Sequence, residues 1–211
     1  MPRPWPDEPL FNVLVVCTGN ICRSALAERL GRAYLAERLG ADAQQISLTS
    51  AGTGAVVDSA MHPDSALVLA GFGGDPEGFR ARQLGKHMAV EADLTLTMTR
   101  AHRRRVLELS PRALARTFTL REAADLLQHT GPDTELVGEN LPDRARLLVS
   151  GLHEARSRRS GSADADDVPD PIGQPVTAHQ QAGDLIAEAL IRVLGRIAAL
   201  QPAGKAHTDA A

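Results

Sequence analysis

The residues of this chain that could carry out chemistry are concentrated in one stretch, Cys17-Thr18-Gly19-Asn20-Ile21-Cys22-Arg23-Ser24. A cysteine thiolate is a strong nucleophile, and a guanidinium such as that of Arg23 can hold two oxygens of a phosphate at once. Backbone N–H groups in a turn that leads into a helix converge on one point, bind anions and favour the thiolate. Cys17 and Arg23 therefore predict a phosphoryl cradle with a nucleophile at its floor, the arrangement of a phosphatase. The residues between them, with Ser24, are expected to bind the phosphate.

The segments on either side of this stretch predict how it is positioned. Residues 11–16 are a β-rich apolar run of the kind buried in a parallel sheet. Residues 25–39 carry apolar side chains at helical spacing and end at Gly40, a plausible helix stop. We therefore expect a strand, a loop and a helix in succession, with Gly19 supplying the unusual backbone angles of the turn.

The rest of the chain alternates in the same way. Further strands are predicted at residues 46–49, 94–98 and 117–120, and helices at 62–70 and 101–111. This alternation predicts an α/β fold with a four-stranded parallel sheet and helices on both faces. Ligands of such folds bind beyond the carboxyl ends of the strands, which is where Cys17 falls.

One domain is expected over residues 11–200, between a flexible arm at 1–10 and a disordered tail at 201–211. Within it, residues 121–167 predict a helical insertion, with helices at 121–129 and 143–158. The last helix is predicted to begin with a capping box at residues 177–180. The arginines at residues 103–105 and 156–159 are interpreted as solvated helix faces.

Composition excludes several classes of protein. The formal net charge of −3 argues against nucleic acid as a main partner, and no apolar run is long enough to span a membrane. The N-terminus lacks the apolar core of a signal peptide, so a cytoplasmic location is expected. With two cysteines in one loop and histidines without ligand spacing, the sequence predicts no disulfide framework, no metal site and no cofactor.

The loop resembles the signature of the low-molecular-weight protein tyrosine phosphatases. Other segments match that family in the same order, and the resemblance covers roughly residues 11–120 and 168–198. The segments are Ala27-Glu28, Ser50-Ala51-Gly52-Thr53, Arg80-Ala81-Arg82-Gln83-Leu84, Leu96-Thr97-Met98 and Asp170-Pro171.

The resemblance implies a metal-independent, two-step hydrolysis of a phosphorylated protein, with phosphotyrosine as the expected substrate. Cys17 would form a phosphocysteine while Arg23 and the loop amides hold the phosphate oxygens. Asp170 would protonate the leaving oxygen and then activate water, with Asp167 as the second candidate for this role. Neither nucleic acid nor a membrane is expected as a partner, and the oligomeric state is not predicted.

Asn20, Ser50 and Cys22 are further candidates for a role at the loop. The family's counterparts of Asn20 and Ser50 hydrogen-bond and support the loop, which is the role expected here, although both residue types also occur in ordinary turns and strand ends. Cys22 could pack in the core or protect Cys17 by forming a reversible disulfide with it, and both interpretations stay open.

The chain also departs from the family pattern. Ile172-Gly173 follow Asp-Pro where family members often carry aromatic residues, Phe79 stands where a histidine is common, and the insertion at 121–167 is long. That insertion could be a lid, a docking surface or a neutral addition.

The alternative functions are a protein arginine phosphatase, an arsenate reductase and a non-catalytic phosphate-binding interaction module. The absence of cysteines after Cys22 counts against the reductase, and Ile21, an apolar loop wall, favours an aryl phosphate.

Overall fold

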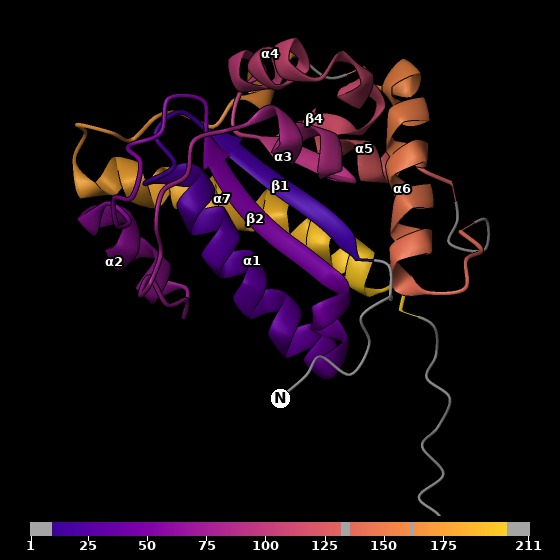
Figure 1. Ribbon diagram of the computed structural model, residues 1–211, viewed down its shortest axis with the longest axis horizontal. Helices are drawn as coiled ribbons and strands as arrows, with labels where there is room; N and C mark the ends of the chain where they lie inside the picture. The colour runs from indigo at the N-terminus through magenta and orange to yellow at the C-terminus, as the bar shows by residue number, and fades with distance from the viewer. Residues whose placement is uncertain (1–9, 132–135, 161–162, 202–211) are drawn as a thin grey trace, which may run out of the picture.

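A four-stranded parallel sheet forms the centre of the molecule, as predicted (Figure 1). The computed structural model describes residues 10–131, 136–160 and 163–201. The strand order is β2-β1-β3-β4, with every neighbouring pair parallel. The strands are β1 (Phe11–Cys17), β2 (Ile46–Gly52), β3 (Leu94–Thr97) and β4 (Thr117–Thr119).

Strand β1 is buried on both sides, which explains its nearly continuous apolar sequence. Because alternate side chains of a strand point to opposite faces, Val13 and Val15 enter the larger core cluster while Leu14 and Val16 enter a smaller one. The register pairs Cys17 with Gly52 at the carboxyl ends of β1 and β2. The two strands therefore deliver their last residues to the same edge of the sheet.

Helices cover both faces of the sheet. The larger cluster receives side chains from α1 (Arg23–Leu39), α2 (Pro63–Gly71), α5 (Leu120–Leu126), α6 (Leu141–Ala155) and α7 (Val176–Ala198). The smaller cluster lies under α3 (Lys86–Glu91) and α4 (Arg100–Leu109). Short 3₁₀ helices complete the described elements at Gly40–Gln45, Pro111–Arg116, Leu127–His129, Arg156–Arg158 and Ala163–Asp166.

The end of α1 and the start of α5 carry the residues typical of helix ends, whereas the start of α7 differs from the prediction. Gly40 ends α1 with a φ of 56°, as expected for a glycine stop. The capping box predicted at residues 177–180 is wrong, because α7 already begins at Val176, after Pro175, whose missing N–H costs nothing at a helix start. A capping box is found instead at the start of α5, between Thr119 and Glu122.

The insertion packs as part of the core. Apolar side chains of α6, including Leu148 and Leu152, are buried in the larger cluster. Arg146 of α6 donates to the Leu10 carbonyl at 2.7 Å and pairs with Asp93, so the helix stands at the amino ends of the strands, away from Cys17 (Figure 1). Helix α6 is therefore not a lid over the loop.

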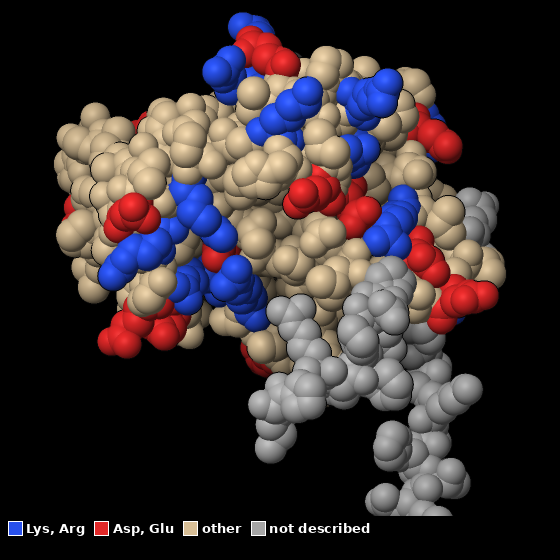
Figure 2. All heavy atoms as spheres, in the orientation of Figure 1, with Lys and Arg blue, Asp and Glu red and all other residues tan. Residues whose placement is uncertain are grey.

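The arm predicted at residues 1–10 and the tail at 201–211 lie almost entirely outside the described residues. On the face shown in Figure 2, positive and negative side chains are interspersed, without a wide surface of one sign. No helix in the described part of the chain has the length and apolar character needed to cross a membrane.

Candidate active site

The stretch from Cys17 to Arg23 forms a loop between the end of β1 and the start of α1. Several of its backbone carbonyls point outward and accept hydrogen bonds from residues 53–62, at distances of 2.8–3.1 Å. These carbonyls belong to Cys17, Thr18, Gly19 and Ile21. Among the described residues, no side chain caps the first turn of α1. With carbonyls turned away and a free helix N-terminus, the centre of the loop favours an anion.

The unusual backbone angle in the loop belongs to Asn20, whose φ is 54°. The expectation that Gly19 would supply it is wrong, since Gly19 is not among the residues with positive φ. Asparagine tolerates the left-handed region better than most residues because its short side chain can hydrogen-bond nearby. Glycine is needed instead at Gly52, where a Cβ atom would lie 2.3 Å from the Thr18 carbonyl oxygen.

The Cys17 side chain is buried and lies among hydrogen-bond donors. Its Sγ is 2.9 Å from Ser24 Oγ and accepts from the backbone N–H of Asn20 at 3.3 Å. Both groups lie close enough to hydrogen-bond to the sulfur. The structure thus brings Cys17, Asn20 and Ser24 together.

A chain of hydrogen bonds orients these donors. The backbone N–H of Arg82 donates to Asn20 Oδ1 at 2.7 Å, which turns the amide nitrogen of Asn20 toward Ser24 and Ser50, at 2.9 and 2.8 Å. Because Ser24 Oγ accepts from Asn20, its own proton is free to point at Cys17. Asn20 and Ser50 therefore lie where a loop-support role requires them.

A buried carboxylate anchors the far end of this chain. Ser50 donates to Glu28 Oε2 at 2.6 Å, and Glu28 is held by Arg32 at 2.9 Å and Arg82 at 2.7 Å. Glu28 is only 3% exposed, so its charge needs these partners. The sequence offered Glu28 only as part of a family match, without a role.

Arg23 reaches from the loop to the segment that carries Asp170. One of its terminal nitrogens contacts the Asp170 carboxylate and the other donates to the Val168 carbonyl at 3.0 Å. Its buried Nε has no hydrogen-bond partner among the described residues, so one donor is available. The structure therefore brings Cys17, Arg23 and Asp170 to one site.

The competing acidic residue points elsewhere. Asp167 accepts from the backbone N–H of Arg100 at 2.8 Å, at the start of α4. Asp166 is buried and pairs with Arg159. Of the three acidic residues whose side chains are described here, Asp170 is the one in contact with Arg23.

A buried histidine that the sequence did not indicate supports the loop from α4. His102 Nε2 lies 2.9 Å from Thr18 Oγ1, and its Nδ1 lies 2.9 Å from Thr99 Oγ1. Burial, helped by the nearby charge of Arg23, lowers the pKa of His102 to about 4. His102 is therefore a neutral hydrogen-bonding group near pH 7. Phe79, which replaces the family's histidine, is instead buried in the larger core cluster.

Cys22, the second thiol, is buried directly before α1. Burial raises its pKa to about 11, against the lowering effect of a hydrogen bond with Ser65. Both cysteines are free. Cys22 lies beside His62 and His179, a grouping that linear spacing could not predict.

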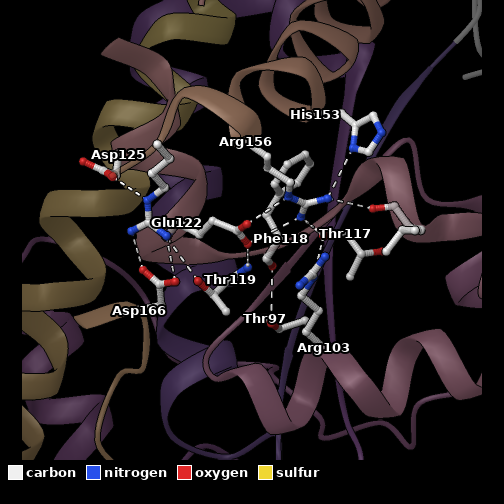
Figure 3. Close-up of polar contacts among 12 residues, drawn as sticks. Thr97, Arg103, Thr117, Phe118, Thr119, Glu122, Asp125, His153, Arg156 and Asp166 are labelled. Carbon is white, nitrogen blue, oxygen red and sulfur yellow. Dashed lines mark hydrogen bonds and ion pairs between the residues drawn. The ribbon is translucent and has the colours of Figure 1, made fainter. Parts of the chain in front are cut away.

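The end of the insertion is tied down just before Asp170. Arg159 is held between Asp125 at 2.6 Å and Asp166, and these carboxylates raise its pKa. Arg156 pairs with Glu122 at 2.9 Å and lies 4.1 Å from the centroid of the Phe118 ring (Figure 3).

The prediction that the arginines at residues 103–105 and 156–159 are all solvated is therefore wrong in part. The side chains of Arg156 and Arg159 are mostly buried. Arg103 is also partly buried, which lowers its pKa, and it donates a hydrogen bond to the Thr117 carbonyl at 3.0 Å. Arg104 and Arg158 are exposed, as expected.

Comparisons with known proteins agree with this fold. The family described as low molecular weight phosphotyrosine protein phosphatase matches residues 12–131. The low molecular weight protein-tyrosine-phosphatase Wzb of Escherichia coli K12 is 40% identical over 100 residues, which are 47% of this chain and 63% of Wzb. Etp of the same strain is 37% identical over 109 residues, which are 51% of this chain and 68% of Etp.

Solved structures share the architecture. Wzb from Escherichia coli K30, in complex with sulphate, has a TM-score of 0.61 at 22% identity, covering 89% of this chain and 98% of Wzb. The YwlE arginine phosphatase from Geobacillus stearothermophilus has a TM-score of 0.62 at 25% identity, covering 88% of this chain and 92% of YwlE. The strand–loop–helix cradle on this parallel sheet is that of a low-molecular-weight phosphatase fold. The chain belongs to the low molecular weight phosphotyrosine protein phosphatase family.

Proposed function

We propose that this protein hydrolyses phosphate monoesters of proteins, with phosphotyrosine as the substrate, through a phosphocysteine on Cys17. The observation that carries the proposal is the meeting of three groups at one loop: the hydrogen-bonded Sγ of Cys17, the guanidinium of Arg23 and the carboxyl group of Asp170. The similarity to Wzb and Etp supports the choice of phosphotyrosine, although the aligned part spans only 63% of Wzb.

In the first step the Cys17 thiolate attacks phosphorus, and the bond from phosphorus to the tyrosyl oxygen breaks. Asp170, in its protonated form, gives its proton to that leaving oxygen, a contribution of about 10²–10⁴-fold. An incoming phosphate draws the Arg23 donors to its own oxygens, which separates Arg23 from Asp170. The free Nε of Arg23 offers a further donor.

In the second step water attacks the phosphocysteine, and the sulfur–phosphorus bond breaks. Asp170, now ionised, accepts the proton of that water. Ser24 stabilises the returning thiolate through its hydroxyl, oriented by Asn20. Arg23 and the loop amides supply the electrostatic stabilisation, so no step depends on a metal ion. We place the reaction in the cytoplasm, because both thiols are free and a reducing compartment keeps them so.

A protein arginine phosphatase is the second candidate, because the YwlE arginine phosphatase shares the architecture at 25% identity. The apolar side chains of Ile21, half-buried, and Ile172, exposed, support an aryl ring rather than a charged guanidinium as the neighbour of the phosphate. An arsenate reductase remains disfavoured, since no cysteine follows Cys22.

The test is hydrolysis of p-nitrophenyl phosphate in the presence of a chelator, comparing the reduced native protein with Cys17→Ser. We expect turnover in the native protein and none in the variant, which should still bind phosphate. A panel of phosphotyrosine and phosphoarginine peptides then decides between the two substrates. No turnover in the reduced native protein would favour a phosphate-binding interaction module instead.

A further inference from the structure

At the Cys22 end of the phosphate loop, three potential metal ligands meet from distant parts of the sequence. Cys22 precedes α1, His62 precedes α2 and His179 lies in the first turn of α7. One ligand atom of each lies within 4.8 Å of the other two. Figure 1 shows why they meet, since α2 lies beside the amino-terminal end of α7.

His179 is oriented as a metal ligand requires. It is 2% exposed, and its Nε2 is buried without a hydrogen-bond partner in the described part of the chain. Its Nδ1 lies 2.8 Å from the hydroxyl of Ser65, itself buried. When Nδ1 donates to that hydroxyl, Nε2 carries the free lone pair, which is the tautomer that metal-bound histidines usually adopt. A buried, unsatisfied ring nitrogen is otherwise destabilising.

His62 and Asp64 complete the surroundings. The His62 ring stacks on His179, with centroids 4.7 Å apart, and its Nδ1 accepts a long hydrogen bond of 3.3 Å from the Asp64 N–H. Binding a metal through either ring nitrogen would sacrifice only that weak bond. The Asp64 carboxylate lies 3.9 Å from His179 Nε2 and is partly exposed, so it can turn toward the cluster.

We propose that Cys22, His62 and His179 form a zinc site, with Asp64 as the fourth ligand. One thiolate, two imidazoles and a carboxylate form a donor set that suits tetrahedral Zn²⁺. Zinc bonds of about 2.0–2.3 Å require neighbouring ligand atoms roughly 3.3–3.8 Å apart, so the cluster closes by about 1 Å on binding. The half-buried His62 and the partly exposed Asp64 make that movement.

The site has a defined relation to the phosphate loop. On binding, the sulfur of Cys22 bonds to zinc and the thiol proton leaves to solvent. The ion then links the loop to α2 and α7, and its ligands do not include Cys17. Zinc at this site therefore stabilises the fold at the Cys22 end of the loop and is distinct from a metal captured by the nucleophile. The inference stands independently of the proposed phosphatase function.

The test uses the full chain, stripped of metal and reduced, titrated with Zn²⁺ or Co²⁺ alone. We expect one ion per chain, a thiolate-to-cobalt absorption band and a rise in melting temperature with zinc. The Cys17→Ser variant should keep all three, whereas Cys22→Ser should lose the absorption band. His62→Ala should weaken binding at least tenfold, and the exposed His87→Ala is its matched control.

Three results would overturn the proposal. The first is no binding at one equivalent of either ion. The second is a cobalt band lost in Cys17→Ser and kept in Cys22→Ser, which would place the metal on the nucleophile. The third is equal binding by His62→Ala and His87→Ala, which would place it outside this cluster.

Discussion

Around Cys17, polar groups are ordered mainly by directed hydrogen bonds, whereas in the insertion they are ordered mainly by pairs of opposite charge. The first region runs from Glu28 through Ser50, Asn20 and Ser24 to the thiol. In the second, Arg159 and Arg156 tie α5 to the segment after α6. Hydrogen bonds have direction and can set where a proton points. Ion pairs mainly hold elements together.

Because of this difference, we expect the first region to serve turnover and the second to serve stability of the same core. Changes in the hydrogen-bonded chain should affect turnover first, and changes in the insertion should affect stability first. The point of contact between the regions is Asp170, which follows the insertion and touches Arg23. Variants in each region test this division, and their expected effects on catalysis decrease from Asp170 to His102.

The largest effect is expected at Asp170, where the two regions meet. Asp170→Asn should slow aryl phosphates with poor leaving groups by about 10²–10⁴-fold, because the leaving oxygen then departs without a proton. p-Nitrophenyl phosphate, with its good leaving group, should be slowed far less. The matched control is Asp167→Asn, whose carboxylate serves the start of α4. Equal slowing of both substrates would remove Asp170 from the role of general acid.

Asn20 tests the hydrogen-bonded chain itself. Asn20→Ala should lower kcat about tenfold to a hundredfold, because Ser24 loses the donor that orients it toward Cys17. The φ of 54° makes Asn20→Gly the informative control, since glycine restores the backbone freedom and not the side chain. Steady-state kinetics of both variants is the measurement. If Asn20→Gly turned over like the native protein, the backbone rather than the amide would position the loop.

Arg159 tests the ion pairs of the insertion. Arg159→Met should destabilise the fold by about 3–5 kcal/mol, because it leaves the buried Asp166 without its partner. Denaturant unfolding measures this loss, while kcat should stay within about threefold where the variant is folded. The exposed Arg158→Met is the control. A large fall in kcat without loss of stability would show that the insertion positions the acid loop directly.

The smallest effect on catalysis is expected at His102, whose protonation makes the stability of the fold depend on pH. Its folded pKa of about 4 lies below the ordinary value of 6.5, so the unfolded chain takes up the proton first as pH falls. The stability from neutral His102 is complete above pH 6.5 and is lost toward pH 4, a loss of about 2 kcal/mol by pH 5. His102→Gln should therefore lose less stability than the native protein between pH 7 and 5, measured by chemical denaturation. Equal losses in the two proteins would refute this role.

The loop from Cys17 to Arg23 could be predicted from sequence because the elements around it are local. A strand, a Cys-x5-Arg loop and a helix follow one another directly, and Gly40 and Pro63 mark helix ends by their own backbone chemistry. The four strands were likewise recognisable from apolar runs, and the structure confirms their parallel sheet. For these strands and helix ends, the signals from neighbouring residues were sufficient.

The remaining features depend on contacts between distant residues. His102 supports Thr18 from 84 residues away, and Glu122 pairs with Arg156 across 34 residues. An arginine-rich helix face resembles a solvated one until its carboxylate partner is placed against it. The capping box was misplaced for the opposite reason, because Thr177 matched a local pattern while Pro175 had already begun the helix.

The most direct test of the account asks where the phosphoryl group goes during turnover. The Asp170→Asn variant, which should lack efficient help for the attacking water, is mixed with p-nitrophenyl phosphate, quenched in acid and analysed by peptide mass spectrometry. We predict a phosphoryl group on the peptide that contains Cys17, bound through sulfur, and none in the matched sample of Cys17→Ser. Turnover without any such adduct, or an adduct that persists in Cys17→Ser, would contradict Cys17 as the nucleophile.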